Sequence, residues 1–256
     1  MSPLLTPHDV QASKVPDVGV GFWCIKLLST AMGEATSDFL VHHFWPPGVV
    51  LIAAAVFAAS LLWQFSRPRY QTGTYWFTVV MVSVFGTMCA DVAHVGFAIA
   101  YSISTTILAL ALALIFFLWH RVEGTLSIHS ITTTRRELFY WAAVTTTFAL
   151  GTATGDLTAV TLHQGYFSSG VIFTALFVLP GLAYPVAHLN AVVAFWVSYV
   201  LTRPLGASYA DWLGVSHARG GLNWGPGNVA LGFSLAIVAG IVMLARAERH
   251  AARGHR

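Results

Sequence analysis

The sequence predicts an all-α membrane protein: a polytopic helical bundle of eight transmembrane helices, arranged as four parallel two-helix repeats. Three observations lead to this prediction: the composition, an internal repeat and the positions of helix-breaking residues. Of the 256 residues, 56% are hydrophobic and only 9% are charged, whereas a soluble domain carries about 25% charged residues. At roughly 20 apolar residues per span, the chain is long enough for eight short spans.

The internal repeat is an aromatic-Trp pair, a glycine ten residues after the Trp, and an aspartate five residues after the glycine. It occurs four times, at Trp-to-Trp intervals of 53, 65 and 55 residues. The four copies contain Trp23, Gly33 and Asp38; Trp76, Gly86 and Asp91; Trp141, Gly151 and Asp156; and Trp196, Gly206 and Asp211. Self-similarity at this period indicates one structural unit that is copied along the chain.

Each repeat holds two hydrophobic segments, which gives eight expected helices in order. We expect them at 18–40, 48–65, 75–98, 101–119, 138–160, 170–187, 191–213 and 228–246. Proline and glycine mark the boundaries at 46–48, 67–69 and 225–227. The expected organisation is a cytoplasmic N-terminal segment 1–17, one membrane domain 18–246 with repeats at about 18–66, 72–120, 137–188 and 191–246, and a basic C-terminal tail 247–256.

Charge asymmetry predicts the orientation. The termini and the even-numbered loops carry ten basic residues, and the odd-numbered loops carry only Arg219. The ten are Lys14, Arg67, Arg69, Arg121, Arg135, Arg136, Arg246, Arg249, Arg253 and Arg256. Because basic residues collect on the cytoplasmic side, both termini are expected to be cytoplasmic. Two spans return the chain to the same side, so the repeats are parallel and their symmetry axis follows the membrane normal.

Helix rise predicts the depth of each motif residue. The Trp lies near the cytoplasmic end of the first helix, where interfacial Trp residues are common. The Asp comes fifteen residues later, about 22 Å further along at about 1.5 Å per residue, in the outer half of a hydrocarbon core about 30 Å thick. The Gly lies near the middle, where a missing side chain lets helices approach closely. Trp and Gly are therefore expected to be structural.

A polar stripe accompanies the aspartates. The residues one turn before them are Glu34, Thr87, Thr152 and Ala207, and an i to i+4 spacing puts each on the face of its Asp. Such residues face a bundle interior or a water-filled cavity, because lipid cannot satisfy them. Four carboxylates at one depth favour a bound cation or protons that offset their cost. The alternative is a packing device copied with the repeat.

Repeats one and two carry additional candidate ligands. His94 lies three residues after Asp91, and a carboxylate with an imidazole suits several divalent metals. We therefore predict a main cation site with Asp38, Glu34, Asp91 and His94 as metal ligands. The predicted pathway also contains Thr87, Thr152, Asp156, Asp211 and Arg203. The other histidines, such as His42, are expected at the outer interface.

Arg203 and Lys26 are basic residues within expected spans. Arg203 lies about 12 Å along the helix from Asp211, too far for a direct pair, but it could reach an acid on another helix or donate to a carbonyl freed by Pro204. Both side chains are interpreted either as counter-charges that lower the cost of the acids or as fixed cations that compete with a transported ion.

The four repeats resemble a known group: bacterial multi-pass membrane proteins built from four copies of a two-helix repeat, usually described as uncharacterised membrane-anchored proteins. The resemblance covers about residues 14–245. It depends on 14–16 with Phe22-Trp23, Gly33-Glu34, Gly151-Thr152 with Gly155-Asp156, and 202–207. It implies eight spans, four repeats and a place in the bacterial inner membrane, and it implies little about activity.

The predicted function is a transporter or channel for a cation, with a divalent metal exchanged for protons as the first candidate. The alternative is a non-transporting membrane sensor, scaffold or cofactor-binding subunit. No nucleotide loop or hydrolase motif appears in the sequence, so we expect no enzyme. The expected partners are the lipid bilayer, a cation and protons, and not nucleic acid. No cofactor is assigned beyond a metal ion as substrate, and a homo-oligomer is left open.

Overall fold

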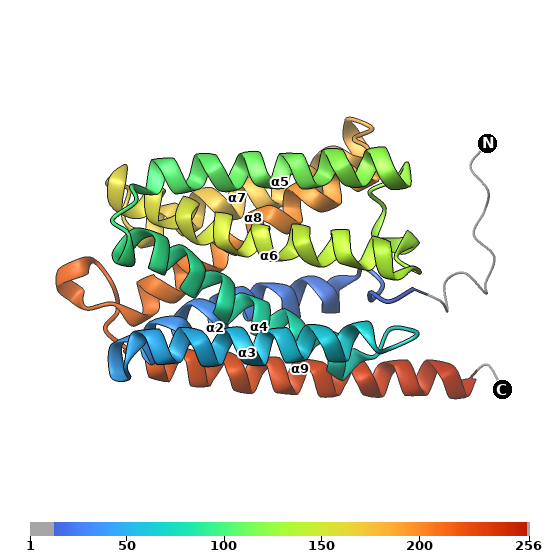
Figure 1. The fold of residues 1–256 in the computed structure, drawn as a ribbon, viewed down its shortest axis with the longest axis horizontal. Coiled ribbons are helices and arrows are strands. Elements are labelled where there is room, and N and C mark those ends of the chain that lie inside the picture. Colours follow the sequence, from blue (N-terminus) through green and yellow to red (C-terminus); the bar gives the residue numbers. More distant parts are fainter. Residues whose placement is uncertain (1–12, 255–256) are drawn as a thin grey trace.

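A computed structural model describes the backbone of residues 13–254 and the side chains of residues 13–248. This part of the chain forms eight long helices that run along one bundle axis (Figure 1). They are α2 (Val20–His43), α3 (Pro46–Phe65), α4 (Thr72–Asp91), α5 (Tyr101–Glu123), α6 (Thr134–Asp156), α7 (Tyr166–Val186), α8 (Ala191–Gly214) and α9 (Pro226–Gly254). The prediction of an all-α fold is confirmed. Most of the N-terminal segment and the last two residues of the tail lie outside the described residues.

Four short elements complete the chain. Two π-helical turns, η1 (Val92–Gly96) and η3 (Leu157–Thr161), directly extend α4 and α6. Two 3₁₀ turns, η2 (Ile128–Ser130) and η4 (His217–Arg219), lie in loops. The π-helical turns begin at the residue after Asp91 and Asp156, and turns of this kind are frequent at functional sites.

Several helices begin or end beyond their predicted limits. Helix α3 begins at Pro46, because proline is well tolerated in a first helical turn, so the expected breaker is a helix start. Helix α5 continues to Glu123 and ends at Gly124, whose φ of 69° makes it a left-handed C-cap. Helix α9 continues to Gly254, since the alanine, arginine and glutamate residues after 244 are good helix formers.

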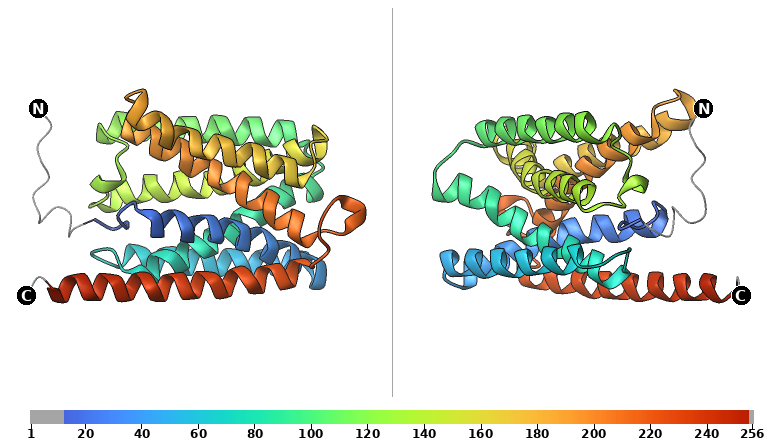
Figure 2. Two further views of the ribbon diagram at one scale, coloured as in Figure 1. Left: turned by 180° about the vertical axis from the view of Figure 1, so that it is seen from behind. Right: turned by 45° about the vertical axis from the view of Figure 1, so that its right-hand side comes forward.

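The helices form two concentric layers. The first helices of the repeats, α2, α4, α6 and α8, each pack against the next, and α8 returns to α2. We call these the central helices. The peripheral helices lie outside them: α3 packs against α4, α5 against α6, α7 against α8, and α9 against α2 (Figure 2). Each second helix therefore packs on the first helix of the following repeat, and α9 closes the circle.

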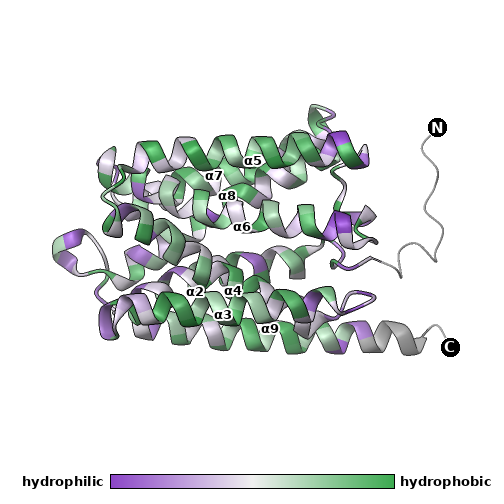
Figure 3. Cartoon of the chain, viewed as in Figure 1, coloured by the Kyte–Doolittle hydropathy of each residue, from purple (hydrophilic) through white to green (hydrophobic). Residues whose placement is uncertain are grey.

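Six helices are long and apolar enough to cross a membrane: α3, α4 with η1, α5, α7, α8 and α9. The peripheral helices expose large apolar side chains such as Leu51, Leu110 and Leu235, and hydrophobic residues predominate along these helices (Figure 3). The remaining two, α2 and α6, are central helices. Helices α2 and α6 can carry more polar residues because the peripheral helices and their central neighbours shield these residues from lipid. These features indicate a membrane protein.

The two ends of the bundle differ in charge. The basic end carries Lys14 and the α3–α4, α5–α6 and α7–α8 loops, and the acidic end carries the four repeat aspartates. At the basic end the Nζ atom of Lys14 lies 2.6 Å from Glu137 Oε2. Gln64 donates to the other carboxylate oxygen at 3.0 Å. This buried cluster ties the segment before α2 to the end of α3 and the start of α6.

The repeat Trp residues lie in an aromatic layer near the basic end. Trp76, Trp141 and Trp196 are buried, with exposed fractions of 0%, 2% and 5%, so they are core residues and not the interfacial anchors that the sequence predicted. Their neighbours are the aromatic side chains that precede them, and the hydroxyls of Tyr75 and Tyr140 lie 2.5 Å apart. The physical reason is that neighbouring helices cover these three rings: Trp76 packs on Phe22 of α2, Trp141 on Tyr75 of α4, and Trp196 on Phe116 of α5. Trp23 of repeat one is half-buried.

The repeat glycines mark the contacts between adjacent central helices. A Cβ atom added at Gly33 would lie 1.8 Å from Ser83 Oγ, and one added at Gly86 would lie 2.7 Å from Phe148 Cβ. The same addition at Gly151 would meet Arg203, and at Gly206 it would meet Thr30. Each contact residue lies three positions before the glycine of the next repeat, so the four contacts run once around the ring.

We predict that Gly86→Leu lowers the free energy of unfolding by about 1–3 kcal/mol, because overpacking separates two helices that touch. Gly232→Leu is the matched control, since nothing lies within 4 Å of a Cβ added there. Unfolding of both variants in detergent provides the measurement. Equal stabilities for the two would contradict the close-contact role of Gly86.

Candidate functional site

Arg203 is the centre of the candidate site. It lies on α8 and is fully buried, yet its guanidinium reaches the three other central helices. Nη2 lies 2.5 Å from Glu34 Oε2 on α2. It also donates to the hydroxyls of Thr87 on α4 and Thr152 on α6, the latter at 2.8 Å. Nη1 donates to the Thr30 carbonyl at 3.2 Å. The Arg203 side chain therefore bonds to each of the three remaining repeats.

The four-residue polar stripe explains how this contact arises. Glu34, Thr87, Thr152 and Ala207 each follow the repeat glycine directly, so all four lie at the helix contacts. The threonine hydroxyls donate to carbonyls of their own helices, Ser83 at 3.0 Å and Phe148 at 3.3 Å, which leaves oxygen lone pairs for Arg203. The structure thus brings Glu34, Thr87, Thr152 and Arg203 together, and Arg203 uses both an acid and a carbonyl on another helix.

Lys26 lies on the same axis toward the basic end, and it too is fully buried. Its ammonium group lies 3.8 Å from the centre of the Phe148 ring and 4.2 Å from that of Tyr199. Among the described side chains and backbone, its Nζ atom has no hydrogen-bond partner. Ring faces attract a cation, most strongly where water is absent. Two basic groups therefore occupy the middle and the basic half of the axis.

The four repeat aspartates lie at the acidic end, one on each central helix. Asp38, Asp91 and Asp156 are half-buried and Asp211 is buried. Asp91 lies within electrostatic reach of Glu34, Asp38 and Asp156, and so does Asp211. Ser37 of α2 donates to Asp91 at 3.3 Å, which links neighbouring repeats directly. We call these four carboxylates, one on each of the four central helices that pack in a closed ring, the acidic ring. They lie one helical turn from the Arg203–Glu34 pair.

Arg219 is a residue of this end that the sequence did not assign to the site. It lies in η4, between α8 and α9, and its guanidinium donates to the Tyr166 hydroxyl at 2.6 Å. It also lies within electrostatic reach of Asp38 and Asp211. The available signal was its position as the one basic residue in the loops of the acidic end.

The predicted metal ligands do not assemble into one site. Glu34 is bound to Arg203, and the ring of His94 stacks on Tyr101 with 3.5 Å between ring centres. His94 Nδ1 lies 2.8 Å from the Ile99 carbonyl oxygen. Within the described residues no three His, Cys, Asp or Glu side chains gather as a metal site. The physical reason is η1, since a π-helical turn changes the angular spacing that would align His94 with Asp91.

The family of the chain follows from its repeats. A family model described as a repeat of unknown function (DUF347) matches residues 21–70, 74–125, 139–188 and 194–250. The chain belongs to this family. Each DUF347 match contains one central helix and the peripheral helix that follows it, which confirms the predicted four-repeat organisation. No curated protein and no solved structure matches the chain.

We predict that Arg203→Met destabilises this DUF347 protein by about 3–5 kcal/mol, because Glu34 is left buried and unpaired. Adding Glu34→Gln should recover part of that loss, since the neutral amide needs no counter-charge. Denaturant unfolding of the two single variants and the double variant measures the coupling. Strictly additive losses would show that the two side chains do not depend on each other.

Proposed function

We propose that this protein is an eight-span membrane transporter that carries a small cation and exchanges it for protons at intramembrane carboxylates. The observation that supports this proposal is the position of the four repeat aspartates at one end of the central helices, one helical turn beyond the buried Arg203–Glu34 pair. Acidic rings lower the energy of a cation at the mouth of a pathway. Intramembrane ionisable residues that face a bundle interior are functional candidates by default.

The eight-span topology is supported by the closed ring of central helices. Helices α2 and α6 have 24 and 23 residues, about 35 Å at about 1.5 Å per residue, which exceeds a hydrocarbon core of about 30 Å. Their polar residues are covered by neighbouring helices, so lipid contact does not penalise them. The charge asymmetry between loops favours cytoplasmic termini, and the family resemblance favours a bacterial inner membrane.

The charges along the axis favour a carrier over an open channel. A cation that enters the acidic ring next meets Arg203 and then Lys26, both buried, and like charges repel strongly where water is excluded. The Arg203–Glu34 pair would therefore act as a closed gate. Cations and protons compete for the same carboxylates because either neutralises the same negative charge. Binding a cation at the ring would accordingly release protons.

The second candidate is a non-transporting sensor or scaffold, in which the acidic ring binds a cation without moving it. The observation that favours it is the fully buried Arg203 side chain, which blocks the path between the central helices. Cation flux distinguishes the two functions, because only a carrier moves the ion across a sealed vesicle. A panel of divalent and monovalent cations, with internal pH recorded, identifies the ion and its coupling.

We predict that Asp91→Asn abolishes cation flux in reconstituted vesicles and leaves the protein folded. Asp211→Asn should have a smaller effect, since repeat four carries Arg203 and Ala207 where repeat one has Thr30 and Glu34. Flux of a divalent metal such as Mn²⁺, measured with a trapped dye, provides the test. If Asp91→Asn and Glu34→Gln both leave flux unchanged, the carboxylates are structural and the transporter proposal fails.

We predict that residues 69 and 164 lie on opposite sides of the membrane. Both side chains are exposed, in the α3–α4 and the α6–α7 loop. Arg69→Cys and Gln164→Cys are introduced singly after Cys24 and Cys89 are replaced by alanine, and a membrane-impermeant thiol reagent is applied to intact cells. Reagent should label position 164 only. Labelling of both positions from outside would exclude the topology.

A further inference from the structure

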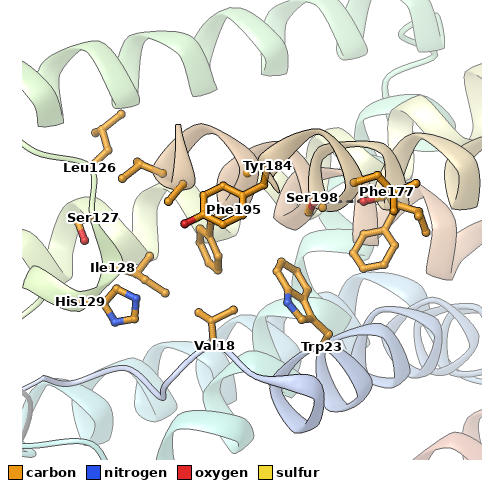
Figure 4. Close-up of a pocket in the computed structure, with 16 residues that line it drawn as sticks. Val18, Trp23, Leu126, Ser127, Ile128, His129, Phe177, Tyr184, Phe195 and Ser198 are labelled. Atoms are coloured by element: carbon orange, nitrogen blue, oxygen red, sulfur yellow. Dashed lines mark hydrogen bonds between the residues drawn. The ribbon is translucent and has the colours of Figure 1, made fainter. Parts of the chain in front are cut away.

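A cavity of about 740 Å³ lies at the basic end, between α2, α7 and α8 (Figure 4). Trp23, Phe177, Leu182 and Phe195 are among its apolar walls, and the α5–α6 loop closes one end with Ser127 and His129. Its described lining contains no Asp, Glu, Lys or Arg. Its volume falls within the range of about 300–1,000 Å³ that is typical of small-molecule sites.

The cavity lies where repeats two and three differ at two packing positions. Repeats two and three begin 65 residues apart in the family matches, so Phe116 and Trp119 of α5 correspond to Gly181 and Tyr184 of α7. Phe116 and Trp119 pack on Trp196, with ring centres 4.9 and 5.7 Å away. A Cβ added at Gly181 would meet nothing within 4 Å. The space that aromatic rings fill beside Trp196 is thus open beside Trp23.

The difference between α5 and α7 also appears in the burial of Trp23. It is the repeat-one counterpart of Trp196, and α7 lies against it as α5 lies against Trp196. Trp196 is buried, whereas Trp23 is only half-buried and keeps one ring contact with α7, to Phe177 at 5.5 Å. Poor packing throughout the basic end would expose all four repeat Trp side chains. The opening instead lies where Gly181 and the exposed Tyr184 replace Phe116 and the buried Trp119.

We infer that this cavity binds the acyl chain of a membrane phospholipid, which enters sideways between α7 and α2 from the leaflet at the basic end. The rim is continuous with the lipid-facing surface, since Val178 and Leu182 line the cavity and are exposed apolar side chains. An uncharged apolar lining matches a hydrocarbon chain. Ser127 and His129 lie at the polar end of the cavity, where a lipid headgroup offers hydrogen-bond partners. This inference is independent of cation transport.

Quenching of Trp23 fluorescence by brominated acyl chains tests the inference. The protein is reconstituted in vesicles of phosphatidylglycerol and phosphatidylethanolamine with plain or brominated chains, and the Trp23→Phe variant isolates the contribution of Trp23. We expect brominated chains to remove most of that contribution. Gly181→Phe, which copies Phe116 of repeat two, should reduce the quenching several-fold because its ring occupies the cavity. The smaller Gly181→Leu should give an intermediate effect and serves if the Phe variant does not fold.

Gly232→Phe is the matched control, because Gly232 is exposed on α9 with nothing near an added Cβ. It should leave the quenching of Trp23 unchanged. Equal quenching in the wild type and both Gly181 variants would mean that Trp23 senses bulk lipid only, and the inference would be overturned. Quenching that appears only after residues 1–12 are deleted would assign the cavity to that segment of the chain and overturn it equally.

Discussion

The buried ion pair between Arg203 and Glu34 lies at the centre of a hydrogen-bond network that joins all four central helices. A fully buried guanidinium is costly in a membrane bundle, and it persists here because an acid, two hydroxyls and a carbonyl from three other helices accept its hydrogens. Those acceptors reach it only because the repeat glycines let the central helices touch. Close packing and charge compensation at the centre therefore require each other.

The near-symmetric scaffold carries strongly asymmetric chemistry. Each repeat supplies the same helix pair, the same glycine contact and the same aspartate, yet the residue three positions before the glycine is Thr30, Ser83, Phe148 or Arg203. Repeat four thus supplies the central guanidinium of Arg203, and repeat three supplies the aromatic ring of Phe148 that faces Lys26. The cavity at the basic end also comes from a difference between repeats, since Gly181 and the exposed Tyr184 stand where repeat two has Phe116 and the buried Trp119. The residues that all four repeats share build the helical framework, and the residues that differ between repeats supply the charged and aromatic groups at its centre.

Much of the framework and part of the site were predictable from spacing. The eight helices, the four repeats and the shared face of Glu34, Thr87 and Thr152 follow from intervals along single helices. The partner of Arg203 did not follow, because Glu34 lies 169 residues away on another helix. The expected pairing of His94 with Asp91 assumed a continuous α-helix, and the π-helical turn after Asp91 removes that geometry. Burial of the repeat Trp residues depends on which helices lie over them.

The class of protein, the repeat count and the matching positions of the four aspartates along their helices follow from the sequence alone. An apolar composition indicates a lipid environment, and constant spacing places equivalent residues at equivalent points of each helix. Only the tertiary structure decided the cyclic order of the helices, the central position of Arg203, the isolation of Lys26 between aromatic rings and the open space beside Trp23. These features depend on how each helix is rotated about its axis and on which neighbour it meets. Rotation and neighbour choice are set by side-chain packing between segments far apart in the chain, and spacing within one segment does not encode them.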